Sequence, residues 1–247
     1  MRLTVVGCSG SFAGPDSPAS CYLVEADGYR LVVDLGNGAL GALQRLLDLD
    51  TVDAVLLSHL HADHCVDLTG WYVQRRYHPD GAVRPPLPVY GPGGVALRIS
   101  GAYDTPVSHL ERALAFREVG EGPLSLGPLA ITLARVAHPV EAYAIRIEHG
   151  GRALVYSGDT GPCEALERLA AGADVLLAEA SFLDGHDQGP GLHLTGGEAG
   201  AVAAAAEVGR LLVTHIPPWH DRSVVLGQAR AAFPAAELAW AGQVVDL

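Results

Sequence analysis

The chain has 247 residues, of which 49% are hydrophobic and 18% charged, a composition typical of a globular protein and not of a disordered or fibrous one. Its 16 Lys and Arg against 28 Asp and Glu give a formal net charge of −12. Such a charge repels polyanions, and the sequence has no basic patch to offset it, so a long RNA is a poor partner.

Short apolar runs alternate with helical patterns along the chain. The runs predict strands at residues 3–7, 21–26, 31–34, 54–58, 89–91, 129–136, 142–148, 153–156, 175–178 and 211–214. Helices are predicted at residues 39–47, 66–77, 162–171 and 195–207. The last one has a clear start, because Thr195 and Glu198 form a capping-box pattern.

Both halves of the chain contain hairpin-like strand pairs followed by strand–helix alternation, which predicts a layered α/β fold. Loops are predicted at residues 78–88 and 184–191, where Pro, Gly and Asp cluster. Neither loop is long enough to link independent domains. We therefore expect residues 1–247 to form a single domain with two similar halves.

The expected compartment is a reducing cytoplasm. The four cysteines are scattered and form no Cys-x-x-Cys pair. The first residues lack the charged leader, apolar core and cleavage site of a signal peptide. No run approaches the roughly 18 uninterrupted apolar residues that a membrane span needs, so we expect no membrane partner.

The segment LLSHLHADH at residues 56–64 places three imidazoles and a carboxylate directly after an apolar strand. In an extended chain, residues i and i+2 point the same way, so His59 and His61 can hold one metal ion. Asp63 and His64 lie past the strand end and can face a second ion. Such ligands suit zinc, iron or manganese, and they are not the thiolate-rich set of a closed structural zinc site. The alternative is a loop that is rich in histidine by chance.

This His-x-His-x-Asp-His pattern resembles the signature of the metallo-β-lactamase superfamily. The resemblance covers nearly the whole chain, since His138, Asp159 and His215 each follow a predicted strand in the order that the family pattern requires. It implies an α/β fold, namely a four-layer αββα sandwich of two βα halves with a dinuclear metal site at one edge.

The resemblance also implies two divalent ions, with zinc expected and manganese or iron as alternatives. The ligands of one ion would be His59, His61 and His138, those of the other Asp63, His64 and His215, and the bridge between them Asp159. Taken singly, His138 or His215 would be read as an ordinary partly buried histidine. Asp34, in VVDLG at residues 32–36, resembles the Asp-x-Gly element that supports the ligands from behind.

The segments LLAEASF at 176–182 and LHLT at 192–195 resemble motifs of the phosphodiesterase branch typified by the tRNA 3′-processing ribonuclease. In that branch a histidine at the position of His193, oriented by a glutamate at that of Glu179, faces the phosphate. The resemblance thus implies Asp63, His193 and Glu179 as catalytic residues, with attack by a metal-bridging hydroxide and proton donation by His193. The alternatives are a surface histidine and a solvated carboxylate.

The substrate is expected to be small. The tRNA-processing enzymes carry a long arm between the third histidine and the bridging aspartate, but Asp159 follows His138 by only 21 positions, and predicted strands fill this gap. Instead, GCSGS at 7–11, GPDSPAS at 14–20 and THIPPW at 214–219 resemble actinobacterial cyclic-nucleotide phosphodiesterases. This similarity implies hydrolysis of 3′,5′-cyclic nucleotides such as cAMP.

The residues that select a base are harder to predict. Trp71, Arg75 and Arg76 can offer a stacking surface and charge, but a helix with an aromatic core face and solvated arginines explains them as well and is preferred. Trp219, close to His215, is an equal candidate for stacking. Relatives on this fold often dimerise, which suggests a homodimer by analogy alone.

The preferred function is thus a dinuclear metal-dependent phosphodiesterase for cyclic nucleotides. The alternatives among enzymes are a ribonuclease of the tRNA 3′-processing type, a phosphodiesterase for another small ester, and a thioester or lactam hydrolase. The non-enzyme alternative is a metal-binding scaffold on the same fold, which would not need an acid such as His193.

Overall fold

Two seven-stranded sheets form the centre of the computed structural model, which describes residues 1–79, 85–185, 189 and 191–247. The first sheet has the order β14-β1-β2-β3-β4-β5-β6, with β1 (Arg2–Gly7), β2 (Cys21–Ala26), β3 (Tyr29–Val33), β4 (Ala54–Leu56), β5 (Leu87–Gly91), β6 (Leu114–Glu118) and β14 (Val244–Asp246). The second has the order β13-β12-β11-β10-β9-β8-β7, with β7 (Gly122–Leu126), β8 (Leu129–Arg135), β9 (Tyr143–His149), β10 (Arg152–Tyr156), β11 (Val175–Glu179), β12 (Leu211–Thr214) and β13 (Glu237–Leu238).

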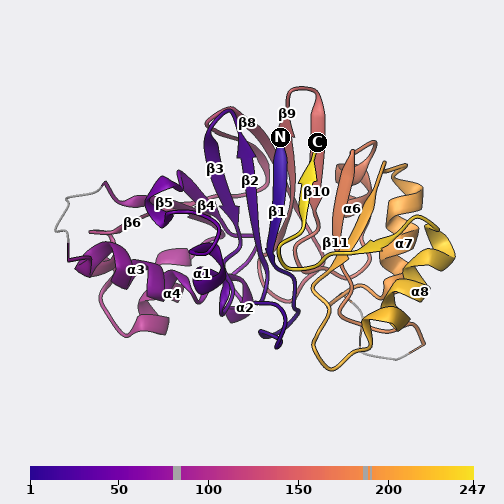
Figure 1. Cartoon of the computed structure of the whole chain (residues 1–247), viewed down its shortest axis with the longest axis horizontal. Coiled ribbons are helices and arrows are strands. Elements are labelled where there is room, and N and C mark those ends of the chain that lie inside the picture. Colours follow the sequence, from indigo (N-terminus) through magenta and orange to yellow (C-terminus); the bar gives the residue numbers. More distant parts are fainter. Residues whose placement is uncertain (80–84, 186–188, 190) are drawn as a thin grey trace.

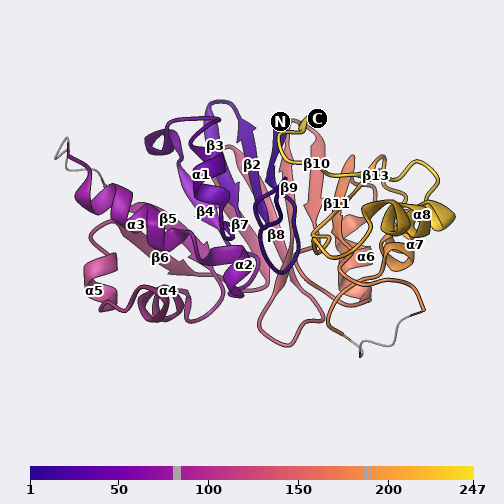
Figure 2. The same ribbon diagram turned by 60° about the horizontal axis from the view of Figure 1, so that its bottom comes forward.

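Helices cover the outer face of each sheet, so the predicted αββα sandwich is confirmed (Figure 1). The first half contains α1 (Ala39–Leu43), the 3-10 helix η1 (Leu49–Thr51), α2 (Ala62–Cys65), α3 (Leu68–Tyr77), α4 (Val95–Tyr103) and α5 (Val107–Leu110). The second contains α6 (Glu164–Ala170), α7 (Gly196–Ala205) and α8 (Arg222–Ala232). Figure 2 shows the same two groups of helices on opposite sides of the paired sheets.

The central strands β4, β11 and β12 are apolar on both faces because they are buried on both sides of their sheets. In β11, Val175 and Leu177 enter the core between the sheets, whereas Leu176 and Ala178 pack against helices α6 and α7. This alternation follows from the two-residue period of an extended chain. The result is one core between the sheets and one further core beneath each helical layer.

Each of the ten predicted strands and four predicted helices coincides with an observed element, and the capping box of α7 is present. Strand β4 is shorter than predicted, because the amide of Ser58 donates to Asp34 instead of a neighbouring strand. The loop predicted at 78–88 is wrong at its end, where Leu87 and Pro88 begin β5. Residues 80–84 of that loop, and 186–188 and 190 of the loop predicted at 184–191, lie outside the described residues.

The two parallel strand blocks determine where functional side chains gather. Strands β3, β4, β5 and β6 run parallel in the first sheet, and β10, β11, β12 and β13 run parallel in the second. In open α/β sheets, the loops beyond the carboxyl ends of parallel strands carry the site. Among the described residues, no helix combines the length and the apolar character needed to cross a bilayer.

Candidate metal centre

Seven side chains converge at one edge of the sandwich, and they are the seven that the sequence predicted as metal ligands. They come from both sheets: His59, His61, Asp63 and His64 lie in the loop and short helix after β4, His138 follows β8, Asp159 follows β10, and His215 follows β12. Their ligand atoms form two groups that share Asp159, and within each group all of them lie within 4.8 Å of one another.

The first group is His59, His61, His138 and Asp159. His61 Nδ1 lies 3.1 Å from His59 Nε2 and 3.2 Å from His138 Nε2. One imidazole nitrogen carries one hydrogen or one lone pair, so hydrogen bonding cannot satisfy both contacts. Ligand atoms placed tetrahedrally around zinc are about 3.3 Å apart, which matches these distances. The first group therefore fits a divalent cation.

The second group is Asp63, His64, Asp159 and His215. Asp159 Oδ1 lies 3.2 Å from His64 Nε2, and its Oδ2 lies 3.3 Å from His215 Nε2. Asp63 Oδ2 is 3.4 Å from His64 Nε2 and 3.7 Å from His215 Nε2. Three buried atoms, His64 Nε2, Asp159 Oδ1 and His215 Nε2, have no hydrogen-bond partner among the described residues. Such atoms cost about 1–3 kcal/mol each, and a shared cation would satisfy all three.

Asp34 holds the second group from behind. Its Oδ2 accepts hydrogen bonds from His64 Nδ1 at 2.7 Å, Ser58 Oγ at 2.8 Å and Tyr156 OH at 2.9 Å, while its Oδ1 accepts from the Ser58 amide at 2.7 Å. The residue is fully buried and has a left-handed backbone, with φ of 56°. A carboxylate on the far nitrogen of a histidine fixes the orientation of its ring and raises its basicity. This is the supporting place that the sequence predicted for Asp34.

Three other imidazoles are oriented by their Nδ1 atoms. His215 Nδ1 lies 2.8 Å from Ser20 Oγ, His138 Nδ1 lies 2.9 Å from the Leu192 carbonyl oxygen, and His59 Nδ1 lies 3.1 Å from Ser58 Oγ. In each ring the Nε2 atom is thereby turned toward the centre. The roles of Ser20 and Ser58 could not be predicted from the sequence, since serine next to a strand end has no distinctive pattern.

Two glycines let the chain approach the centre closely. A Cβ on Gly36 would lie 1.9 Å from the Asp63 carbonyl oxygen, and a Cβ on Gly10 would lie 2.4 Å from the His215 carbonyl oxygen. Any side chain at these positions would push the ligand-bearing backbone away. The close approach explains why glycine follows Asp34 by two positions.

Burial and charge set the protonation states of these groups. Burial lowers the pKa of His59 well below its ordinary value and also lowers the pKa of His61 and His138, which keeps these rings neutral, as a metal ligand must be. Burial alone would raise the pKa of Asp159, but the surrounding imidazoles of His215, His64 and His59 outweigh it and hold that pKa well below its usual range. The shared carboxyl is therefore anionic.

His193 and Glu179 form a separate pair beside the ligands. His193 Nδ1 lies 2.8 Å from Glu179 Oε1, and the same carboxylate accepts from the amides of Thr160 at 2.8 Å and Ser181 at 3.1 Å. Burial alone would lower the pKa of His193, but the Glu179 carboxylate outweighs it and raises that pKa to about 9. The ring centroid of His193 is 5.8 Å from that of His215. A positively charged donor thus lies against the ligand cluster.

One side of the centre is open to solvent. His59, His64, Asp159 and His215 are buried, whereas the other ligands and His193 are partly exposed. Ligands that are buried behind and accessible in front leave room for a substrate, as in catalytic metal sites and unlike closed structural ones.

The residues proposed for base recognition differ in their surroundings. Trp71 is fully buried in the core beneath the helices of the first half, which confirms the aromatic core face of the preferred interpretation and rules Trp71 out as a stacking surface. The prediction of solvated arginines is wrong for Arg75, whose side chain is only 7% exposed. Arg75 donates to the carbonyl oxygens of Ala113 and Pro85, so it ties α3 to the segments beside it. Arg76 lies over the ring of Tyr77. Trp219 is 63% exposed.

Comparison with known proteins gives consistent matches. A family model described as a beta-lactamase superfamily domain matches residues 29–216. An uncharacterized protein of Mycobacterium leprae is 51% identical, over 94% of this chain and 84% of its own. The probable metallo-hydrolase YhfI of Bacillus subtilis is 30% identical over 94% of both chains, and its crystal structure matches with a TM-score of 0.88 over 99% of this chain and 98% of its own. A ribonuclease Z of Bacillus licheniformis is 28% identical, over 74% of this chain and 77% of its own.

Proposed function

Because the chain belongs to the beta-lactamase superfamily and is a metal-dependent hydrolase, we propose that it is a dinuclear phosphodiesterase for 3′,5′-cyclic nucleotides such as cAMP. The observation that carries the proposal is the sharing of Asp159 between two groups of ligand atoms. Two such adjacent groups are the arrangement by which hydrolases hold both the attacking and the leaving side of a phosphodiester.

The seven clustered side chains would hold the ions. The first ion would be bound by His59, His61, His138 and Asp159, and the second by Asp63, His64, His215 and Asp159. Bound divalent ions lower the pKa of water and neutralise the charge that grows on the phosphoryl oxygens. The buried carboxylate of Asp34 holds His64 in place during the reaction.

His193 is assigned the proton that the leaving oxygen needs. Its bond to the buried carboxylate of Glu179 fixes the ring and keeps it positively charged. Breaking a ribose ester bond expels an alkoxide, which is a poor leaving group unless it is protonated as it departs. Glu179 is thus a positioning residue, and His193 is the general acid.

A small substrate fits the rest of the chain better than tRNA does. Between His138 and Asp159 the chain forms the antiparallel pair β9–β10, which occupies the place of an inserted arm. The net charge of −12 also disfavours a long polyanion. A cyclic nucleotide carries a single phosphodiester charge and needs neither an arm nor a basic surface.

The first experiment measures hydrolysis of bis-p-nitrophenyl phosphate by purified protein with added Mn²⁺ or Zn²⁺. Asp63→Ala is expected to abolish turnover, because it removes a carboxylate from the second ligand group. Asp246→Ala, which alters an exposed carboxylate paired with Arg2, is the matched control and is expected to retain activity. Undiminished turnover in Asp63→Ala would contradict the mechanism.

The second experiment compares cAMP, cGMP and a tRNA precursor side by side. Hydrolysis of a cyclic nucleotide with little or no tRNA processing is the expected result. Rapid 3′ trimming of the tRNA together with inert cAMP would favour a ribonuclease like the Bacillus licheniformis relative. Hydrolysis of bis-p-nitrophenyl phosphate alone would indicate another small phosphodiester.

A further inference from the structure

Two large aromatic side chains lie exposed and in contact on neighbouring loops. Phe12 is 41% exposed and Trp219 is 63% exposed, and their ring centroids are 5.1 Å apart with an interplanar angle of 39°. Exposed aromatic rings that adjoin each other are uncommon on a protein surface and mark places where a ligand or partner binds.

Both loops lie directly beside His215, one of the candidate metal ligands. Gly10 donates its amide to the Ile216 carbonyl oxygen at 3.1 Å, and Ser9 and Ile216 form a β-bridge. A Cβ on Gly10 would lie 3.0 Å from Cδ2 of His215, so this glycine lies against the imidazole ring itself. Phe12 follows Gly10 by two residues, and Trp219 follows His215 by four. At no more than about 3.5 Å per residue, the backbone of Phe12 lies within about 7 Å of Gly10 and that of Trp219 within about 14 Å of His215.

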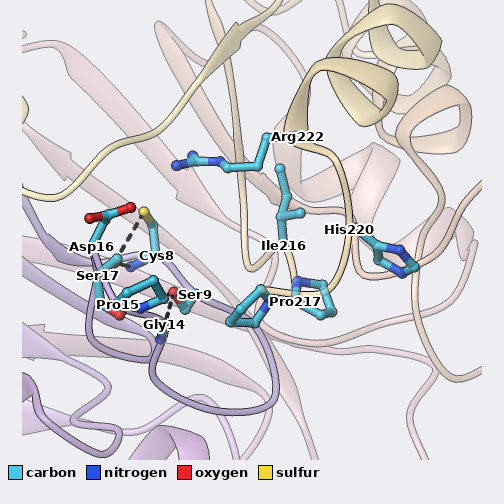
Figure 3. A pocket seen from close by; sticks show the side chains of 11 residues that line it. Cys8, Ser9, Gly14, Pro15, Asp16, Ser17, Ile216, Pro217, His220 and Arg222 are labelled. Carbon is cyan, nitrogen blue, oxygen red and sulfur yellow. Dashed lines mark hydrogen bonds between the residues drawn. The ribbon is translucent and has the colours of Figure 1, made fainter.

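The loops are also held against each other. Figure 3 shows the segment with Ser9 and Gly14 facing Pro217 across a small cavity, with His220 on the far side. A Cβ on Gly14 would lie 3.1 Å from Cγ of the neighbouring Pro218, so the backbone at Gly14 packs closely against the proline ring. The Trp219 indole donates to His220 Nε2 at 3.2 Å. The two rings therefore lie on loops whose positions are fixed by contacts with each other.

We propose that Phe12 and Trp219 form the surface on which the base of the cyclic nucleotide stacks. This inference rests on the proposed function, in which the ligand cluster recognises only the phosphate and leaves the base without a partner. A neutral aromatic base gains from contact with an exposed ring, whatever its hydrogen-bonding edge, so the surface tolerates different bases. The group that binds to this aromatic surface is the nucleobase, and not the sugar or a protein partner.

The test uses metal-loaded enzyme and two substrates, cAMP and the base-free ribose 3′,5′-cyclic phosphate, with hydrolysis followed by phosphorus NMR. Trp219→Leu and Phe12→Leu are each expected to lower kcat/KM for cAMP about tenfold, mainly through a higher KM. Both variants should retain the wild-type kcat/KM for the base-free substrate. Trp240→Leu is the matched control, because Trp240 is 55% exposed but lies in the turn before β14.

A second readout is the quenching of tryptophan fluorescence by AMP. Quenching is expected in the wild type and in Trp240→Leu and should be lost in Trp219→Leu. The inference would be overturned if Trp219→Leu and Phe12→Leu behaved like the Trp240→Leu control, or if they lowered kcat/KM equally for both substrates. Wild-type enzyme that cleaves bis-p-nitrophenyl phosphate but neither cyclic substrate would instead contradict the proposed function, and this inference would fall with it.

Discussion

At the scale of single residues, the carboxylate of Asp34 accepts four hydrogen bonds beside the candidate metal centre. It binds His64, Ser58 and Tyr156 through side chains that are all buried. Ser58 in turn lies 3.1 Å from His59 Nδ1, so one carboxylate orients a ligand in each of the two groups. The functional role of Asp34 is thus exerted through its neighbours.

Asp34→Asn is therefore expected to weaken metal binding about 10- to 100-fold, because the amide cannot accept a hydrogen bond at every place where the carboxylate does. Competition with a chromogenic chelator would measure the affinity. Asp246→Asn, at an exposed ion pair, serves as the control. Unchanged affinity in Asp34→Asn would show that His64 needs no such partner.

His193→Ala separates acid catalysis from metal binding. Turnover of cAMP is expected to fall by about 10²–10⁴, with metal content unchanged. The loss should be smaller for bis-p-nitrophenyl phosphate, whose nitrophenolate departs without a proton. Metal analysis and kinetics on both substrates check this. A protein that has lost its metal would identify His193 as a ligand or a folding residue.

At the scale of elements, the strongly apolar segments could be predicted, whereas several edge strands and helices could not. Strand β7 contains Gly122 and Pro123, which argue against a strand but are tolerated at the edge of a sheet. Strand β13 has two residues and β14 three, too few for any period to appear. Helix α8 was missed because two valines and Gly227 obscure its pattern.

The same contrast applies to the candidate site. The seven clustered side chains could be predicted because their residue types, their places after apolar strands and their order resemble the pattern of the metallo-β-lactamase superfamily. Ser20, Tyr156 and Phe12 could not, since their places depend on contacts between segments far apart in sequence. That residues 1–247 form a single domain, and that each clustered side chain binds a particular one of the two ions, remain predictions.

Thr195, the N-cap of helix α7, lies two residues after His193, so the capping box of this helix should matter for both stability and activity. Thr195→Ala is expected to lower the free energy of unfolding by about 1 kcal/mol, since it removes the bond from Thr195 Oγ1 to the Glu198 amide. Turnover of cAMP, which needs the proton of His193 under the proposed function, should fall as well. Urea denaturation and kinetics provide the measurements.

The matched control for Thr195→Ala is Asp221→Ala, which removes the N-cap of α8. A similar loss of stability with unchanged turnover of cAMP is expected. Equal effects on turnover in the two variants would mean that activity follows global stability and not the placement of His193.

At the scale of the whole molecule, the metal centre joins the two halves. The loop after β4 belongs to the first sheet, whereas His138, Asp159 and His215 come from the second. Without a cation, buried polar atoms of both halves face one another without partners. Bound metal should therefore contribute to the stability of the assembled sandwich and not only to chemistry.

Removal of metal with a chelator is accordingly expected to lower Tm, and addition of Zn²⁺ or Mn²⁺ should restore it. A ligand at 100 times its Kd adds about 2.7 kcal/mol to the stability of the folded state. Calorimetry or thermal circular dichroism would detect the change. The same chelator should leave the Tm of Asp159→Ala almost unaffected, and an equal decrease there would contradict a metal origin.

The shared carboxylate of Asp159 also affects how the protein takes up its metal ions. One oxygen approaches His64 and the other approaches His215 and His59, so an ion on either side fixes the side chain for its neighbour. Under the proposed function, both ions would share this single carboxylate, so the occupancy of one site would change the affinity of the other for metal. Activity would then depend on the free metal concentration through both sites together and not through either one alone.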